Sequence, residues 1–233
     1  MTKQEKREIR DKLILENARM IVKRDGIIEF KMSEIAKASK ISIGTLYIHF
    51  ISKEDVLLAL ACQNIVEVKA FFQEISKLDC SNKEKLLAFT FTSHIRRAKE
   101  SYISELEQLV TNTSIRNRAS KYKIQEHDSL IQEAVLLVKS ILLEAIKENS
   151  PKAENTEGIC DNLLFGLWSL SLGSLSILEL NIFKKHDLDI NNPLIVNASC
   201  LINSYLKDKP LDHKNINHII EETKNLIKKG IQC

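Results

Sequence analysis

The residues whose types and spacing could carry a function lie between Met32 and Lys53. Apolar residues recur there at helical spacing in two short runs, one that begins at Met32 and includes Ile35, and one that contains Leu46 and Phe50. The few residues between the runs leave room only for a turn. Two short helices joined in this way are typical of a helix-turn-helix, whose second helix enters the major groove of DNA. The chemistry would be hydrogen bonding to a nucleic acid.

The second helix has an inward and an outward side. In the turn, Ile41 would be an apolar plug and Ser42 would cap the second helix. Both helices need a common core, so Leu46 and Phe50 should point inward. The residues on or near the outward side are then Ile43, Gly44, Thr45 and Tyr47.

Several short segments follow one another in a fixed order: Ile35-Ala36, Gly44-Thr45-Leu46-Tyr47, His49-Phe50 and Ser52-Lys53-Glu54. Upstream, the spacing of a first helix is kept by Ile14-Leu15, Ala18, Ile21-Val22 and Gly26. In this combination the chain resembles the TetR-type (TetR/AcrR) transcriptional regulators, collinearly over about residues 9 to 58.

The resemblance implies roles for individual side chains. Tyr47 and His49 would donate to DNA phosphates, although they could also be an ordinary surface aromatic and imidazole. Thr45 and Lys53 would contact the DNA backbone, and Lys37 could add a contact. No residue near the base edges has the bidentate fork of Arg, Asn or Gln, so reading would rest on methyl contacts, close approach at Gly44 and DNA shape. The predicted DNA-binding residues are Ser33, Lys37, Ser42, Ile43, Gly44, Thr45, Tyr47, His49 and Lys53.

Three residues depart from the pattern of the resembled family. Lys31 stands where a Ser or Thr cap is usual, Lys40 where the turn usually has Gly, and Ile48 where a polar residue is common. A positive φ at Lys40 would be less comfortable than at glycine. These departures leave an alternative open, a helical ligand-binding or assembly protein whose N-terminal module no longer reads DNA.

The composition indicates a folded helical protein. The chain has 233 residues, 44% of them hydrophobic and 28% charged, with six Gly and three Pro. So few turn-forming residues favour long helices over a many-stranded sheet, and we predict an all-α fold. Residues 1–53 hold 12 Lys and Arg against 7 Asp and Glu, so positive charge coincides with the motif. Five of these cations form either a DNA-binding surface or an ordinary solvated helix start: Lys3, Lys6, Arg7, Arg10 and Lys12.

Catalytic, metal and disulfide chemistry is not indicated. The sequence contains no Gly-x-Ser-x-Gly elbow and no phosphate-binding glycine loop, so we expect no enzymatic activity. The five cysteines form no Cys-x-x-Cys pair, and no two of the six histidines stand four residues apart. We therefore expect no disulfide framework, metal site or cofactor. The basic, polar N-terminus is not a secretory signal, and we expect a cytoplasmic protein.

Helical periodicity continues through the chain. A first helix is predicted over about residues 3–25 with Gly26 as a left-handed stop, and Ser52 is expected to cap a fourth helix after the motif. Residues 113–120 are ambiguous, and further helices are predicted at about 83–98, 101–111, 121–148, 158–180, 193–207 and 212–229. The resemblance implies a helix-turn-helix DNA-binding domain at 1–53 and a helical ligand-binding and dimerisation domain at 54–233.

The segment 158–180 is the most apolar in the chain. Its uncharged part is shorter than the ~20 residues that cross a bilayer, so we predict a buried helix and no membrane partner. In the resembled family two C-terminal helices pair with their symmetry mates, which implies a homodimer through 158–180 and 193–207. Close approach of another helix is expected along a stripe of small residues, Gly166, Ser169, Gly173 and Ser176.

The resemblance also implies a transcriptional regulator that acts as a repressor and that a small molecule releases from a palindromic DNA operator. The residues available to line a cavity are largely apolar or aromatic, so we expect an apolar or aromatic effector. Each of them could equally be an ordinary core or surface residue. They are Phe89, His94, Tyr102, Leu106, Tyr122, His127, Ile131 and Trp168.

Overall fold

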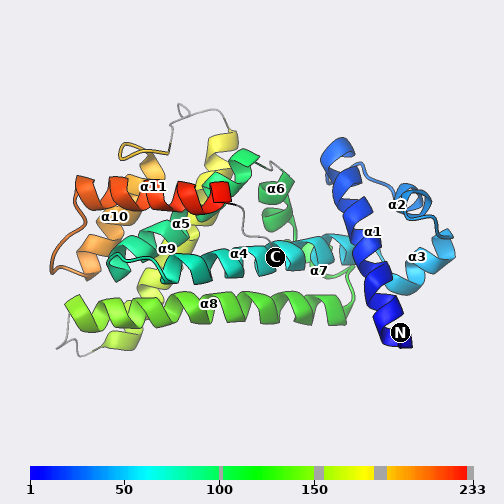
Figure 1. Ribbon diagram of the computed structural model, residues 1–233, viewed down its shortest axis with the longest axis horizontal. Helices are drawn as coiled ribbons and strands as arrows, with labels where there is room; N and C mark the ends of the chain where they lie inside the picture. The colour runs from blue at the N-terminus through cyan, green and yellow to red at the C-terminus, as the bar shows by residue number, and fades with distance from the viewer. Residues whose placement is uncertain (100–101, 150–154, 181–187, 230–233) are drawn as a thin grey trace. The chain divides into compact units, whose positions relative to one another are not determined.

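The fold is all-α, as predicted, in a computed structural model that describes residues 1–99, 102–149, 155–180 and 188–229 (Figure 1). No strand occurs within these ranges. The predicted helices are present with bounds within two residues, and the ambiguous stretch contains the short helix α7. In chain order they are α1 (Lys3–Asp25), α2 (Met32–Ala38), α3 (Ile43–His49), α4 (Lys53–Ser76), α5 (Asn82–Lys99), α6 (Tyr102–Leu109), α7 (Thr113–Arg116), α8 (Lys121–Asn149), α9 (Thr156–Glu179), α10 (Pro193–Tyr205) and α11 (His213–Lys229).

The chain forms two compact units. The first consists of Met1–Val66 and Glu100–Ile131, and the second of Glu67–Lys99 and Gln132–Cys233. α4 and α8 each continue from one unit into the other. Compact units do not by themselves assign functions, so the functional boundary after residue 53 remains a prediction.

The first unit has its core among α1, α2, α3, α4 and α6. α1 is closed at its start by a capping box, in which Thr2 Oγ1 accepts from Glu5 N (3.1 Å) and Thr2 N donates to the Glu5 carboxylate (2.9 Å). It ends at Asp25 and is followed by Gly26, whose φ of 88° favours glycine but whose ψ of 162° lies outside the left-handed helical region that was predicted for this stop. Ser52 Oγ caps α4 as predicted by accepting from Asp55 N (3.0 Å). The core is filled by Ile14, Ala18, Ile21, Ile35, Leu46, Phe50, Leu58 and Leu106, among others.

The second unit packs α5 against α9, α10 and α11. The last helix presents an apolar face to this core through Ile216, Ile219, Ile220 and Ile227. A buried lysine on α5 also holds the segment before α11, because Lys83 Nζ donates to the carbonyls of Leu206, Asp208 and Lys209. α11 is therefore an integral part of the unit.

α9 contains the apolar segment 158–180 that was predicted as a buried helix. Its inner side, with Cys160, Leu163 and Leu167, is buried in the core of the second unit. On its outer side Phe165 exposes 76% of its surface and Trp168 exposes 39%. Among the described residues, no helix combines the length and the apolarity that a membrane span needs.

Candidate nucleic-acid interface

The turn between α2 and α3 is closed by two backbone hydrogen bonds. Ile41 N donates to the carbonyl of Ala36 at 3.0 Å. Lys40 N donates to the carbonyl of Lys37 at 3.1 Å. These bonds form a Schellman motif, in which the residue after the helix is left-handed. Lys40 is that residue, with a φ of 55°, so a lysine stands where glycine is favoured.

A buried amide holds this turn against α1. Asn17 Nδ2 donates to Ser39 Oγ at 3.2 Å and to the carbonyl of Leu13 at 2.9 Å. Ile41 packs against the core of the first unit, as predicted for an apolar plug. α1 therefore fixes the turn, and with it the start of α3.

The inner side of α3 is fixed in the core as predicted. Leu46 and Phe50 are both fully buried. Ser42 caps the helix, because its Oγ accepts from Thr45 N at 3.0 Å and lies 2.8 Å from Thr45 Oγ1. The Ser42 hydroxyl thus bonds to the Thr45 hydroxyl as well as to the backbone.

The outer side of α3 is open. Ile43 exposes 44% of its surface and Tyr47 exposes 46%, whereas Thr45 is half-buried. Among the described atoms, a Cβ on Gly44 would approach only Ser42 Oγ, at 3.8 Å, so packing does not require glycine there. Its backbone can be approached closely. The predicted DNA-binding residues that are exposed are Ser33, Lys37, Ser42, Ile43, Gly44 and Tyr47.

His49 lies inward at the end of α3. Its side chain is 7% exposed, and Nδ1 contacts a carboxylate oxygen of Asp11 on α1. The other Asp11 oxygen lies 4.0 Å from Arg7 Nε. His49 was predicted to donate to phosphates, and the structure also gives it an intramolecular partner 38 residues away. Helical spacing within the motif contains no signal for that contact.

Lys53 is held against the segment that joins α1 to α2. Its Nζ donates to the carbonyl of Ile28 and lies 4.2 Å from the centroid of the Phe30 ring. Burial lowers the pKa of the Lys53 ammonium. The cation proposed for the DNA backbone therefore also stabilises this segment.

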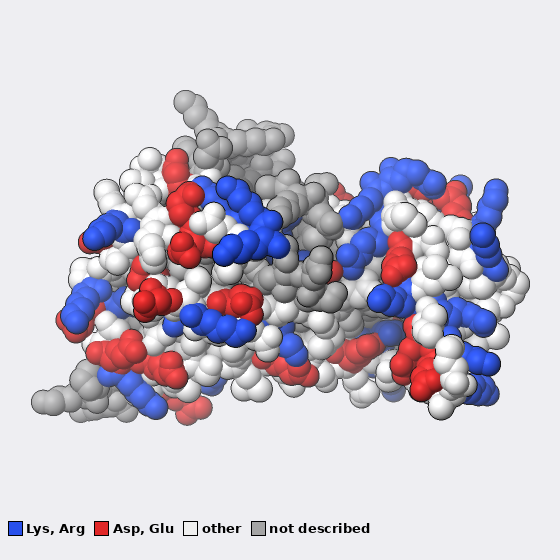
Figure 2. Space-filling view, in the orientation of Figure 1, with Lys and Arg blue, Asp and Glu red and all other residues white. Residues whose placement is uncertain are grey.

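Both positively and negatively charged side chains cover α1, α2 and α3, and Lys and Arg side chains reach the edge of this part of the molecule (Figure 2). Some of these cations are neutralised by carboxylates. Arg24 lies 2.5 Å from Asp25 and 2.8 Å from Glu34, and its guanidinium lowers the pKa of Asp25. The cations without such neighbours are the ones available to phosphates.

The residues predicted to line a ligand cavity are divided between the two units. In the first unit Leu106 and His127 are buried, Tyr102 and Ile131 are half-buried, and Tyr122 exposes 69% of its surface. His127 Nδ1 lies 3.1 Å from Asp128 Oδ1. Tyr122 is thus a surface residue of its own unit.

In the second unit Phe89 and His94 lie on α5, and Trp168 lies on the outer side of α9. The rings of Phe89 and Phe72 pack with their centroids 4.7 Å apart. His94 Nε2 lies 3.3 Å from Ser174 Oγ of α9. This part of the unit therefore combines an aromatic pair with a polar pair.

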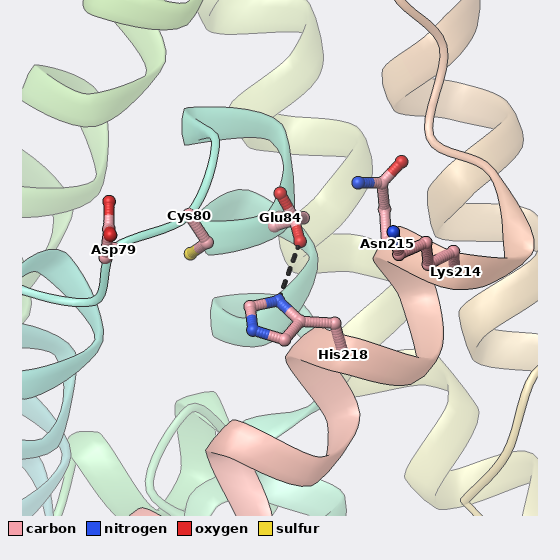
Figure 3. A pocket seen from close by; sticks show the side chains of 6 residues that line it. All are labelled: Asp79, Cys80, Glu84, Lys214, Asn215 and His218. Carbon is pink, nitrogen blue, oxygen red and sulfur yellow. Dashed lines mark hydrogen bonds and ion pairs between the residues drawn. The ribbon is translucent and has the colours of Figure 1, made fainter.

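An open pocket of about 320 Å³ lies where α11 meets the segment between α4 and α5 (Figure 3). Glu84 and His218 point toward each other, with His218 Nδ1 3.1 Å from Glu84 Oε1. Burial, together with the Glu84 charge, raises the pKa of the Cys80 thiol to about 11, so this thiol is protonated at neutral pH. No cluster of three or more metal-ligating side chains occurs in the described part of the chain. The sequence contained no local signal for this pocket, because its sides come from segments far apart.

The stripe of small residues on α9 has two parts. A Cβ on Gly166 would lie 2.6 Å from Leu201 Cδ2, so the close approach there is to α10 of the same chain. A Cβ on Gly173 would meet no described atom within 4 Å, and Ser169 and Ser176 are exposed. Gly166 therefore has an intramolecular packing role, while the other three positions are open.

The comparison with known proteins gives a family match over the N-terminal motif. Residues 14–60 match the family described as bacterial regulatory proteins, tetR family. The chain is 25% identical over 154 residues to the fatty acid metabolism regulator protein of Bacillus subtilis, which covers 66% of this chain and 76% of that protein. These descriptions are of regulators, in agreement with the prediction that the chain is not an enzyme.

Solved structures share the fold along most of the chain. FadR of Bacillus subtilis in complex with stearoyl-CoA has a TM-score of 0.56 at 18% identity, over 83% of this chain and 96% of that one. A TetR-family transcriptional regulator of Mesorhizobium loti has a TM-score of 0.59 at 14% identity, over 91% of this chain and 100% of that one. Residues 14–60 therefore match the helix-turn-helix of the tetR family, and the chain as a whole has the fold of these solved structures.

Proposed function

We propose that this chain is a homodimeric transcriptional repressor that binds a palindromic DNA operator and is released from it by a small apolar effector. The observation that carries the proposal is the outer face of α3. Ile43 and Tyr47 are exposed there, while Leu46 and Phe50 fix the inner face in the core. Such a helix can enter the major groove without any change in the core.

The proposed contacts divide into positioning and reading. Tyr47, Thr45 and Lys37 would donate to phosphates and set the register of the protein on DNA. Base edges would be met by the start of α3, where Ile43 offers methyl groups and Gly44 offers a bare backbone. Ser33 and Ser42 would add hydroxyl contacts. His49 and Lys53 would contact the DNA backbone beside α3, and each would keep its intramolecular contact.

The proposed dimer interface lies on α9 and α10. Phe165 and Trp168 on α9, and Val196 on α10, are large apolar side chains exposed within one chain. Gly173 and the neighbouring serines leave room for close helix packing. A two-fold pair is also what a palindromic operator requires, since each half-site is read by one reading helix.

The proposed effector binds in the helical region 54–233. The fatty acid metabolism regulator that is 25% identical, and the similar fold of FadR in complex with stearoyl-CoA, support a ligand with a long apolar part. The Phe72 and Phe89 rings and the pair of His94 and Ser174 would offer apolar contacts and a polar anchor. An effector releases DNA only if it binds more tightly to the state of the protein that cannot bind DNA. The coupling free energy between effector and DNA binding is usually ~1 to 3 kcal/mol, or about 5- to 150-fold in affinity.

The test is selection of bound duplexes from random DNA, followed by mobility shift at several salt concentrations. The protein should enrich a palindromic sequence, bind it with a steep salt dependence and release it when stearoyl-CoA is added. Enrichment without release by stearoyl-CoA would support the proposed DNA binding and exclude stearoyl-CoA as the effector. Absence of enrichment by folded protein would instead favour a helical ligand-binding or assembly protein.

A further inference from the structure

We infer that the first turns of α1 form a cationic arm that binds phosphates flanking the DNA sequence under α3, an inference that rests on the proposed DNA binding. The arm is defined as residues 3–10. All residues from 1 to 10 are exposed, so the arm adds nothing to the core. The family match begins at residue 14 and does not include the arm.

The cations of the arm share one face of the helix. Lys3, Arg7 and Arg10 recur at steps of four and three residues, and one more step leads to Ile14, which is fully buried. Since such steps follow one side of an α-helix, the cations continue the buried stripe of α1 beyond the core. Lys6 lies beside them. The other face of the same turns carries Glu5, Glu8 and Lys12.

This face begins beside the end of α3. Asp11, at the base of the arm, contacts His49, the last residue of α3. From there the N-terminal turns of α1 extend past α3 (Figure 1). Cations on this side of α1 would therefore meet the backbone next to the groove that α3 occupies, and not the groove itself.

The arm is formed and available. The capping box of Thr2 and Glu5 holds the helix to its first turn. Within the described part of the chain, Lys3, Lys6 and Arg10 have no carboxylate within ion-pair distance, and Arg7 is 4.0 Å from Asp11. At 1.5 Å per residue the arm spans about 10 Å, the length of about three base pairs.

The experiment uses the operator that the wild-type protein selects from random duplexes, cut at the ends of the selected sequence or extended by about six base pairs on each side. Affinity is measured by fluorescence anisotropy over a range of salt concentrations. Wild type should bind the extended duplex at least tenfold more tightly. The variant Lys3→Gln/Lys6→Gln/Arg10→Gln should not show this gain, and its salt slope should fall by about 0.9 for each phosphate that the arm no longer neutralises.

A matched pair of single variants separates the effect of the helix face from the effect of losing one positive charge. Arg10→Gln and Lys12→Gln each remove one cation from the same turn of α1 but from different faces, and only Arg10→Gln should reduce the gain from the longer duplex. An unchanged gain in the triple variant, or equal effects of the two single variants, would overturn the arm while leaving the proposed function intact. If folded wild-type protein selected no sequence, the proposed function would fail first, and the arm with it.

Discussion

His49, the last residue of α3, contacts Asp11 of α1 through its Nδ1 atom. This contact ties the C-terminal end of the reading helix to the helix that carries the core of the first unit. Asp11 also places a negative charge on the side of α1 that we propose faces DNA. On electrostatic grounds alone that carboxylate would weaken binding, whereas a carboxylate that positions α3 would strengthen it.

The first prediction uses these opposite expected effects of the Asp11 carboxylate on operator affinity. Asp11→Asn should weaken operator binding about fivefold, because replacing a charge-assisted hydrogen bond by a neutral one, a loss of about 1 kcal/mol, loosens the end of α3. Operator affinity at fixed salt is the measurement. The control is Glu8→Gln, which removes the same charge from the same helix without touching α3 and should bind as tightly as wild type or more so. Tighter binding by Asp11→Asn would show that the contact has no positioning role.

The second prediction concerns Gly44. A Cβ at this position has room beside Ser42 Oγ, and alanine is the better helix former by up to about 1 kcal/mol. Gly44→Ala should therefore keep or raise the free energy of unfolding in urea, while operator affinity falls at least tenfold because the methyl group separates α3 from the bases. If affinity were retained, the backbone of α3 would not approach DNA at this residue.

The third prediction concerns the left-handed residue of the turn. Lys40→Gly should raise the free energy of unfolding by about 1 kcal/mol, because φ is 55° there and glycine relieves the clash of a Cβ. The matched control is Lys37→Gly, in the last turn of α2, which should lower it by a similar amount. Urea denaturation followed by far-UV circular dichroism measures both. Equal destabilisation by the two variants would show that the turn does not strain Lys40.

Much of the first unit was predictable because its signals are local. The inward direction of Leu46 and Phe50, the caps at Ser42 and Ser52 and the stop at Gly26 all follow from periodicity and from residues within a few positions of a helix end. The helix-turn-helix and the all-α class rest on such signals. The exposure of Ile43 and Tyr47 then follows from the burial of the opposite side.

Contacts between distant segments were not predictable. Lys53 binds the carbonyl of Ile28, and Lys83 binds carbonyls near residue 208, through chain reversals that periodicity cannot specify. The small-residue stripe on α9 correctly indicated close packing at Gly166 but not its partner, which is Leu201 of the same chain. Spacing tells which face is small, and only the tertiary structure tells what covers it.

The fourth prediction separates the two parts of this stripe. Gly166→Ala should lower the free energy of unfolding by up to about 1 kcal/mol without changing the oligomeric state, because the added Cβ displaces the end of the Leu201 side chain and the better helix propensity of alanine offsets part of that cost. Adding Leu201→Ala to this variant should restore part of that free energy. Gly173→Leu should leave the fold of the chain intact and weaken the proposed dimer in sedimentation velocity. A wild-type protein that sediments as a monomer at micromolar concentration would rule out the dimer.

The central claim is that the outer face of α3 reads DNA, and it is tested most directly by selecting duplexes from random DNA with wild type and with Ile43→Ser. Wild type should enrich a palindrome whose half-site centres lie about 10 base pairs apart, or a multiple of that spacing. Ile43→Ser should keep the spacing and change the preferred bases within each half-site, because it removes methyl contacts in the major groove. An identical enriched sequence for both proteins, or no enrichment by folded wild type, would contradict the account.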